Sequence, residues 1–212
     1  MLYPLNLKLE GVACAVVGGG EIALQKARAL LECGARLRLV SPRLVEGLEQ
    51  LHRDGAFEWL AREYHEGDLQ GARMVVCATN RPEVNREVHR HGRAAGALVN
   101  VVDVPELCDF YVPSIVRRGD LMVTVSTGGK CPGLSRRLRL QLEREFGPEY
   151  AVYLELLAEA REDLHQRISD PRRRLEIMNQ LLDLPCRLEG LAGDGERLLR
   201  ERVRRGLDEL TG

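Results

Sequence analysis

Three consecutive glycines open the most distinctive motif of the sequence. The segment GGGEIA, residues 18–23, fits the pattern G-x-G-x-x-A/G, follows an apolar run and precedes a helical pattern. In that context Gly18 permits a sharp turn, Gly20 lets a pyrophosphate approach the backbone, and Ala23 lets the helix pack closely on the strand. The helix N-terminus adds unpaired N–H groups and a positive dipole end. The motif therefore predicts a dinucleotide site; the alternative is a tight strand–helix turn without a ligand.

Two further segments are expected at the same edge of the sheet. The second strand ends in LVSPR, residues 39–43, without the acidic residue that holds the ribose of NAD, so the spacing leaves NAD and NADP open. Arg43 either faces a 2′-phosphate or is a solvated residue in the first turn of the next helix. Thr79 and Asn80 follow the fourth strand, where backbone and hydroxyl groups are candidates for the ribose and nicotinamide end. Asn80 alternatively caps the helix that begins at Pro82.

A carboxylate follows the fifth predicted strand, which ends in NVVD, residues 100–103. At that position Asp103 is expected near the nicotinamide, where it is a candidate general base that accepts a proton while a hydride leaves for the cofactor. The alternative is an Asp at the strand end that fixes the following turn through its own backbone.

A basic segment follows between residues 117 and 144. It carries seven positive and two negative side chains, a net charge of +5 in a chain of net charge −1. Because arginine forks match carboxylates, this segment predicts an anionic second substrate; the alternative is a solvated helix face. The positive residues are Arg117, Arg118, Lys130, Arg136, Arg137, Arg139 and Arg144, and the negative ones are Asp120 and Glu143.

The composition limits the class of protein. With 44% hydrophobic and 30% charged residues, the 212-residue chain can fill a core, which excludes wholesale disorder. The net charge of −1 gives no global basic field for nucleic acid or an anionic membrane, and no apolar run approaches the roughly 18 residues of a spanning helix. The N-terminus does not resemble a signal peptide. Six scattered cysteines without a CxxC pair indicate reduced thiols and a cytoplasmic location, and no Cys/His set predicts a metal site.

Apolar runs and helical patterns alternate in the first half of the chain, which predicts a parallel sheet with right-handed crossovers. The second half reads as one strand followed by helices. The expected strands are 12–17, 37–40, 57–60, 74–78, 97–102 and 121–126, and the expected helices are 21–33, 44–52, 82–95, 134–146, 149–169, 172–184 and 195–210.

Three stretches, residues 4–42, 77–85 and 99–139, resemble in order and spacing the siroheme-synthesis dehydrogenases, precorrin-2 dehydrogenase and sirohydrochlorin ferrochelatase. The resemblance covers residues 2–145 well and the helical tail only by character. It implies an α/β fold: a Rossmann-like NAD-binding domain at 1–112, a dimerisation segment at 113–148 and a helical C-terminal domain at 149–212. It also implies a homodimer that oxidises precorrin-2 to sirohydrochlorin with NAD. Bifunctional members then insert ferrous iron.

The resemblance assigns roles to individual residues. The family's catalytic aspartate falls on Asp103. Its cofactor contacts fall on Glu21, Ile22, Pro42 and Arg43. Because the family uses NAD although its second strand lacks the usual acid, the resemblance favours NAD over NADP. The residue patterns add Gly18, Gly20, Thr79 and Asn80 as candidate cofactor contacts. Candidate substrate contacts are Asn100, Thr127, Gly128, Lys130 and Arg136. The competing hypotheses are a non-catalytic NAD(H)-binding redox sensor with a helical output domain, and an NADP-dependent reductase of another acid.

Overall fold

The computed structural model describes residues 2–183 and 195–211. The chain divides into two compact units, Met1–Val112 and Pro113–Gly212. The further boundary predicted at 148 falls inside the second unit and stays a prediction. Residue 184, the last of one predicted helix, and the thiol of Cys186 lie outside the described residues.

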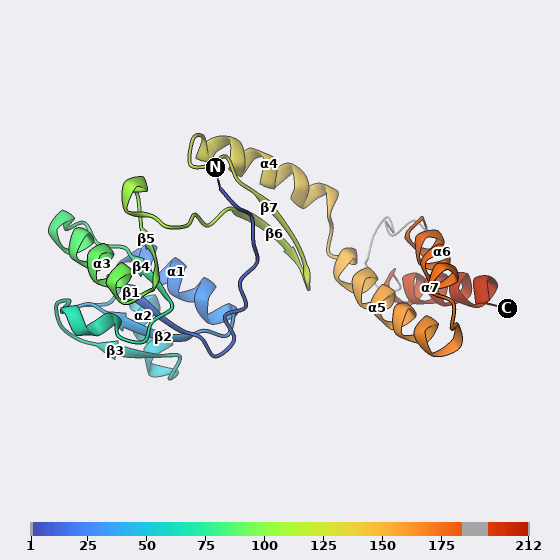
Figure 1. The fold of residues 1–212 in the computed structure, drawn as a ribbon, viewed down its shortest axis with the longest axis horizontal. Coiled ribbons are helices and arrows are strands. Elements are labelled where there is room, and N and C mark those ends of the chain that lie inside the picture. The colour runs from blue at the N-terminus through green and yellow to red at the C-terminus, as the bar shows by residue number, and fades with distance from the viewer. Residues whose placement is uncertain (1, 184–194, 212) are drawn as a thin grey trace. The chain divides into compact units, whose positions relative to one another are not determined.

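Five parallel strands form the centre of the first unit, in the order β3-β2-β1-β4-β5 (Figure 1). Each strand is four or five residues long. Nearly all side chains of the central strands β1 and β4 are buried, because helices cover both faces of a parallel sheet, whereas only Phe57 is buried in the edge strand β3. The predicted Rossmann-like α/β fold is confirmed. The strands are β1 (Ala13–Val17), β2 (Arg36–Val40), β3 (Phe57–Leu60), β4 (Met74–Cys77) and β5 (Leu98–Val101).

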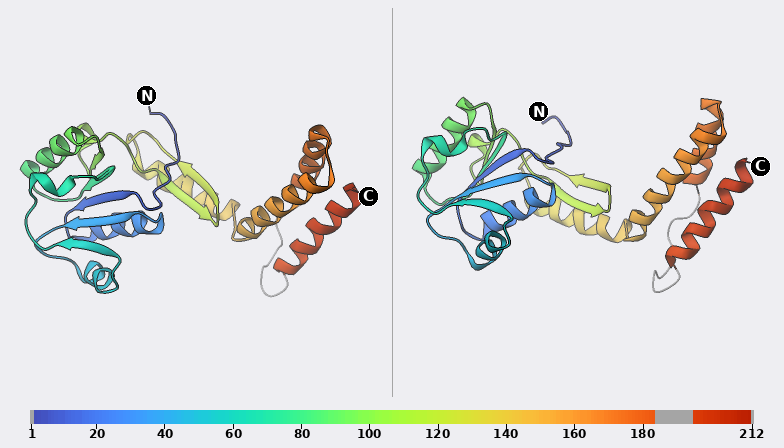
Figure 2. Two further views of the ribbon diagram at one scale, coloured as in Figure 1. Left: turned by 60° about the horizontal axis from the view of Figure 1, so that its bottom comes forward. Right: turned by 90° about the horizontal axis from the view of Figure 1, so that it is seen from below.

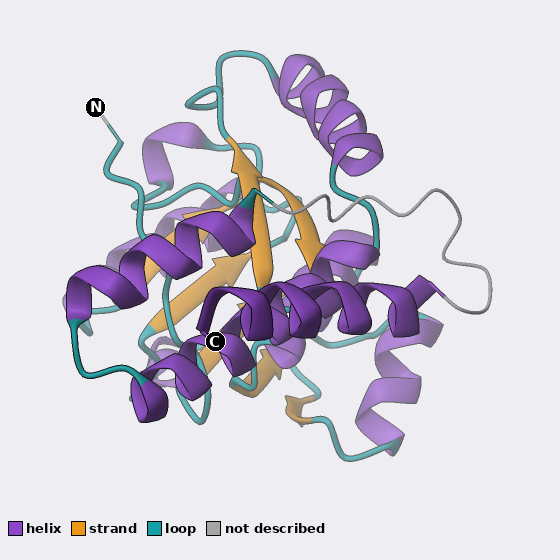
Figure 3. Ribbon diagram, turned by 90° about the vertical axis from the view of Figure 1, so that its right-hand side faces the viewer, coloured by secondary structure: helices purple, strands orange, loops and turns teal. Residues whose placement is uncertain are grey.

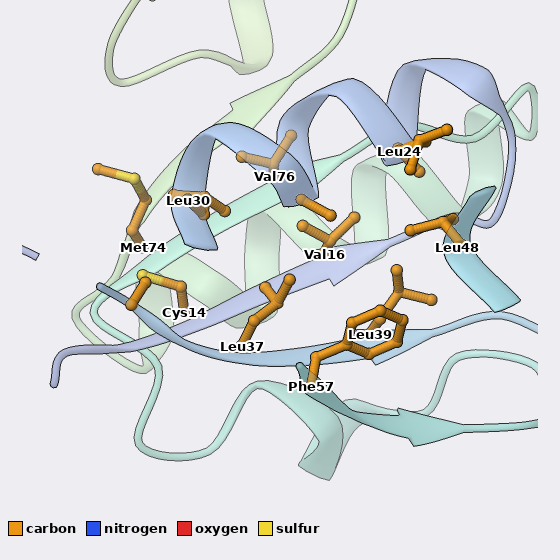
Figure 4. Close-up of a cluster of buried hydrophobic side chains, with 13 residues drawn as sticks. Cys14, Val16, Leu24, Leu30, Leu37, Leu39, Leu48, Phe57, Met74 and Val76 are labelled. Carbon is orange, nitrogen blue, oxygen red and sulfur yellow. The ribbon is translucent and has the colours of Figure 1, made fainter. Parts of the chain in front are cut away.

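The helices of the first unit bury one apolar stripe each against this sheet. On one face, α1 (Glu21–Glu32) and α2 (Glu46–Arg53) pack Leu24, Leu30 and Leu48 onto Val16 and its neighbours in β2 (Figure 4). On the other face, α3 (Pro82–Ala94) packs its buried valines onto β4 and β5. Each such side chain contributes roughly 1.5–3 kcal/mol to the free energy of folding when it is fully buried. Packing on both faces of the sheet therefore holds in place the strand ends that carry the site.

A buried carboxylate holds the connection between β3 and β4. Asp68, in the short 3₁₀ helix η1 (Glu66–Leu69), is 5% exposed and accepts two hydrogen bonds from Arg62, at 2.6 and 2.8 Å. A third comes from the backbone N–H of His65, at 2.7 Å. Burial raises the pKa of Asp68, but the hydrogen bonds from Arg62 and His65 outweigh it and hold the pKa below its ordinary value.

Asp68→Asn is expected to reduce the free energy of unfolding by about 1–3 kcal/mol at neutral pH, because it removes a charged acceptor from a buried site. A lowered pKa in the folded state contributes stability above the unfolded pKa, and that stability is lost as the pH falls below about 4. The free energy of unfolding should therefore fall less between about pH 6 and about pH 3 in the variant than in the wild type, as measured by denaturant unfolding at both pH values. Glu87→Gln, an exposed position on α3, is the control; equal pH dependence in Asp68→Asn and the wild type would refute the role of Asp68.

The second unit begins with a hairpin that packs on a helix. Strands β6 (Ser114–Arg118) and β7 (Leu121–Val125) pair antiparallel, and α4 (Pro132–Glu145) packs against both. Arg118 anchors the helix end, donating to the carbonyl oxygens of Phe146 at 2.8 Å and Glu143 at 3.2 Å. Only the second strand of this hairpin was predicted from the sequence. The first was missed because Pro113 precedes it and two arginines end it, which leaves only a short apolar core.

Three helices complete the second unit: α5 (Glu149–Arg167), α6 (Pro171–Leu182) and α7 (Gly195–Thr211). They lie side by side in both views of Figure 2 and bury Leu164, Ile177, Leu181 and Leu199 between them. Helices thus dominate this unit, in contrast to the alternating strands and helices of the first. Figure 3 draws the helices of the chain in purple and its strands in orange. Over the described ranges, no helix combines the length and apolar character that crossing a bilayer requires.

Candidate functional site

The glycine turn joins the carboxyl end of β1 to the start of α1. Gly18 has a φ of +127°, and a Cβ there would overlap the carbonyl oxygen of Ala78 at the end of β4. Its N–H donates to the Val40 carbonyl oxygen at 2.9 Å, so the turn also touches the end of β2. The sharp turn predicted at Gly18 is therefore present. It lies where β1 leads to β2 on one side and neighbours β4 on the other, the topological switch point at which α/β sheets bind ligands.

The start of α1 has the features of an anion cradle. Gly20 is its N-cap, and no side chain caps the helix, so the N–H groups of the first turn lack a side-chain acceptor. A Cβ at Gly20 would meet no atom within 4 Å, so the space beside this glycine is open. Glu21 and Ile22 are exposed there, whereas Ala23 is fully buried against the sheet. These groups fit the pyrophosphate of a dinucleotide.

The middle glycine fastens a second loop to the turn, a role that sequence analysis did not assign to it. A Cβ at Gly19 would overlap the carbonyl oxygen of Arg43, and the Gly19 carbonyl oxygen accepts the N–H of Val45 at 2.9 Å. Trp59 secures the same loop by donating from Nε1 to the Ser41 carbonyl oxygen at 2.9 Å. Pro42 and Arg43 are consequently held, exposed, beside the glycine turn.

A polar network organises the end of β4. The Thr79 hydroxyl donates to Oδ1 of Asn85 at 2.7 Å and accepts the backbone N–H of Arg81 at 3.2 Å. The interpretation of Asn80 as the N-cap of α3 was wrong: the N-cap is Arg81, because Thr79 supplies the acceptor, and Asn80 is exposed. Asn85 was not among the residues predicted for the site. A polar residue one position after the buried Val84 was the available signal.

Asp103 occupies the third position of a β-turn at the end of β5. The N–H of Val104 donates to the Val101 carbonyl oxygen at 3.2 Å, and Asp103 has a φ of +61°. Turns with a positive φ at this position favour glycine or asparagine. Over the described residues, Asp103 is the only non-glycine residue with a positive φ. Backbone strain of this kind concentrates at functional sites.

The Asp103 turn lies on the strand next to the one that touches the glycine turn. The N–H of Val102 donates to the Cys77 carbonyl oxygen at 2.9 Å, and the N–H of Ala78 donates to the Val17 carbonyl oxygen at 2.8 Å. The ends of β1, β4 and β5 therefore follow one another along a single edge of the sheet. Asp103 is exposed at that edge, and it forms no side-chain hydrogen bond or ion pair with another described residue.

Asn100, a predicted substrate contact, is buried beneath this turn. It is 8% exposed, and its Nδ2 donates to the Phe110 carbonyl oxygen at 2.8 Å. The amide nitrogen therefore holds the loop that follows Asp103, and a contact between Asn100 and substrate stays a prediction.

The glycine-rich loop of the second unit is folded around Thr127. The Thr127 hydroxyl lies 3.1 Å from Oγ of the buried Ser135 and accepts the N–H of Cys131 at 3.2 Å. Gly128 has a φ of +61°, and the Lys130 N–H donates to the Thr127 carbonyl oxygen at 3.2 Å. This arrangement leaves the ammonium end of Lys130 exposed at the start of α4.

The basic residues of the segment 117–144 divide into two groups. Arg118 and Arg139 bond within the unit, to the end of α4 and to Glu143 respectively. The other positive side chains of this segment are exposed and form no ion pair with a described residue; they are Arg117, Lys130, Arg136, Arg137 and Arg144. Among the described residues, no group of three or more His, Cys, Asp or Glu side chains converges on a point where a metal ion would be held.

Comparison with known proteins defines the class first. Residues 5–114 match the model of the family described as "Putative NAD(P)-binding", more than half of the chain, and the chain belongs to that family. The match covers β1 to β5 with the glycine turn and Asp103, and it confirms the predicted nicotinamide dinucleotide cofactor.

Particular relatives then agree with the family resemblance found in the sequence. The chain is 41% identical over 203 residues to a siroheme synthase of Pseudomonas entomophila, and 40% identical over 211 residues to that of Pseudomonas paraeruginosa. These alignments cover 94% and 98% of this chain, but only 44% and 45% of the relatives. The solved structure of SirC, precorrin-2 dehydrogenase, matches with a TM-score of 0.78 and 26% identity, over 96% of this chain and 100% of that one.

Proposed function

We propose that this chain is an NAD-dependent precorrin-2 dehydrogenase that forms sirohydrochlorin. The observation that carries the proposal is the exposed, strained Asp103 at the sheet edge that also carries the glycine turn. The similarity to SirC over the whole length of that structure, and to nearly half of the siroheme synthases, supports the substrate. A redox sensor needs the dinucleotide site but has no need of a strained carboxylate beside it.

The chemistry requires two acceptors. Oxidation of precorrin-2 removes one hydride and one proton, and NAD, when bound, supplies the hydride acceptor. Asp103 takes the proton as general base. The N–H groups at the start of α1 and the open space at Gly20 hold the pyrophosphate, and the loop at Pro42 and Arg43 borders the ribose end.

The exposed basic residues of the segment 117–144 suit the binding of an anionic substrate. Precorrin-2 carries several acetate and propionate groups, and unpaired Arg and Lys side chains bind carboxylates through charge-assisted hydrogen bonds. We assign this contact to Arg136 and Lys130, with Thr127 and Gly128 shaping the loop beside them.

Mixing the purified protein with precorrin-2 and NAD tests the proposal. NADH absorbance should rise as sirohydrochlorin forms, and tetrapyrrole addition should change protein fluorescence even without NAD. NAD binding with neither turnover nor tetrapyrrole binding would instead support the redox sensor. Turnover with NADP in preference to NAD, reversed by Arg43→Ala, would support the NADP-dependent alternative.

We also propose that the protein acts as a cytoplasmic homodimer. The hairpin β6–β7 packs one face on α4, while Ile115 and Met122, on its other face, are only half-buried. Apolar side chains that stay partly exposed on a face away from α4 are typical of an interface, which supports a second copy as the partner. Five of the described cysteines are free, as suits a reducing compartment.

Insertion of ferrous iron into sirohydrochlorin is a second reaction to test with this protein. The macrocycle supplies the nitrogen ligands, and Asp103 is available to take the pyrrole protons. Adding ferrous or cobaltous ion after oxidation, and following the macrocycle spectrum, decides between a bifunctional enzyme and a dehydrogenase alone.

A further inference from the structure

The thiol of Cys108 braces the turn that carries Asp103. Its Sγ lies 3.1 Å from the carbonyl oxygen of Val101 and 3.3 Å from that of Val104. These are the first and last residues of the β-turn whose third residue is Asp103. The single thiol proton is therefore within reach of both ends of the strained turn.

Neighbouring groups fix the sulfur in this place. The short helix η2 (Pro105–Leu107) leads the chain back under the turn, and the Cys108 N–H donates to the Pro105 carbonyl oxygen at 3.2 Å. Nδ2 of Asn100 lies 3.4 Å from Sγ and donates to Phe110 as well. The sulfur thus accepts from an amide on one side and donates to carbonyls on the other. Burial raises the pKa of the Cys108 thiol, so it remains a donor at neutral pH.

The contacts of the Cys108 thiol with Val101 and Val104, called the brace below, affect the geometry of the turn more than the stability of the fold. Both carbonyls have a second donor: the N–H of Val104 bonds to Val101 at 3.2 Å, and that of Leu107 bonds to Val104 at 2.9 Å. Loss of the thiol therefore leaves neither oxygen unsatisfied. Because Asp103 has no side-chain partner among the described residues, the turn backbone sets where its carboxylate points.

We propose that Cys108 is a positioning residue for the dehydrogenation: its thiol holds the 101–104 turn in the left-handed conformation that presents Asp103 to substrate. This inference rests on the proposed function, because the group it positions is the proposed base.

The activity test compares Cys108→Ala with Cys108→Ser. Alanine should lower kcat roughly tenfold with an unchanged KM for NAD, because small displacements of a catalytic group are costly. Serine, which keeps a donor at the same place, should restore most of the rate. In an Asp103→Asn background, Cys108→Ala should have no further effect. Cys33→Ala, at the exposed C-cap of α1, is the control. Wild-type kcat in Cys108→Ala, or failure of serine to restore the rate, would overturn the proposal.

A second experiment tests the conformation of the 101–104 turn through protein stability and does not depend on enzyme activity. At ordinary φ, glycine is less stable than alanine, but at the positive φ of Asp103 the order reverses. Asp103→Gly should therefore unfold at a higher temperature than Asp103→Ala, and the difference should shrink by more than half when Cys108→Ala is added. An unchanged difference would overturn the brace. If this arm succeeds while the wild type fails to oxidise precorrin-2, the proposed function fails and the brace stands.

Discussion

Asp103→Asn is expected to lower kcat for precorrin-2 oxidation by roughly 10²–10⁴-fold, the contribution of a positioned general base. Asparagine keeps the size of the side chain and tolerates the left-handed backbone at φ +61°, so the fold and the turn should survive. The loss should appear in kcat and kcat/KM together, because the proton is taken only in the transition state. Steady-state NADH formation measures both parameters.

The control for this variant is a carboxylate on the same loop. Glu106, in η2, is exposed and forms no side-chain bond with another described residue. Glu106→Gln changes the local charge by the same amount and should leave kcat near the wild-type value. NAD affinity, measured by titration, should be unchanged in both variants. Full activity in Asp103→Asn would show that another group takes the proton.

Gly20→Ala is expected to abolish NAD binding in a protein that folds normally. The added methyl group meets no protein atom within 4 Å, so the structure accommodates it. It enters the space beside the first turn of α1, where the pyrophosphate must approach the backbone. Titration with NAD should show a loss of at least about 100-fold in affinity, which corresponds to about 3 kcal/mol. The melting temperature without NAD should equal that of the wild type.

Gly19→Ala is the matched comparison, because it adds the same methyl group one residue earlier. There the methyl overlaps the backbone carbonyl oxygen of Arg43 and crowds the Ser41 hydroxyl, so the loop after β2 must move. Overpacking of this kind costs about 1–3 kcal/mol of stability. Gly19→Ala should therefore lose both stability and NAD affinity. If Gly20→Ala bound NAD as tightly as the wild type, the pyrophosphate would not bind at this turn.

The sheet could be predicted because its signals are local. The apolar runs in β1 and β4 and the glycine turn after Val17 each act within a few residues, so their order along the chain defines the parallel fold. The strand β6 could not be found in this way. Its stability comes from pairing with β7 and from α4, contacts that its own sequence does not encode.

The candidate site divides in the same way. Gly18, Gly20 and Asp103 follow from their positions at strand ends, which the pattern of elements already fixes. The tie between Gly19 and the Arg43 loop, and the reach of Cys108 to Val101 and Val104, depend on tertiary contacts. The hydrogen bonds of Thr79 could not be predicted from its motif either, since its hydroxyl bonds to Asn85 and to the N–H of Arg81 at the start of α3.

In the proposed reaction, a dinucleotide at the glycine turn and a tetrapyrrole meet at the carboxylate of Asp103. A crystal structure of the protein with NAD and sirohydrochlorin bound tests this most directly. We expect pyrophosphate density against the N–H groups that begin α1, and macrocycle density against the Asp103 carboxylate. Pyrophosphate bound elsewhere, or an Asp103 side chain turned away from the macrocycle, would contradict it.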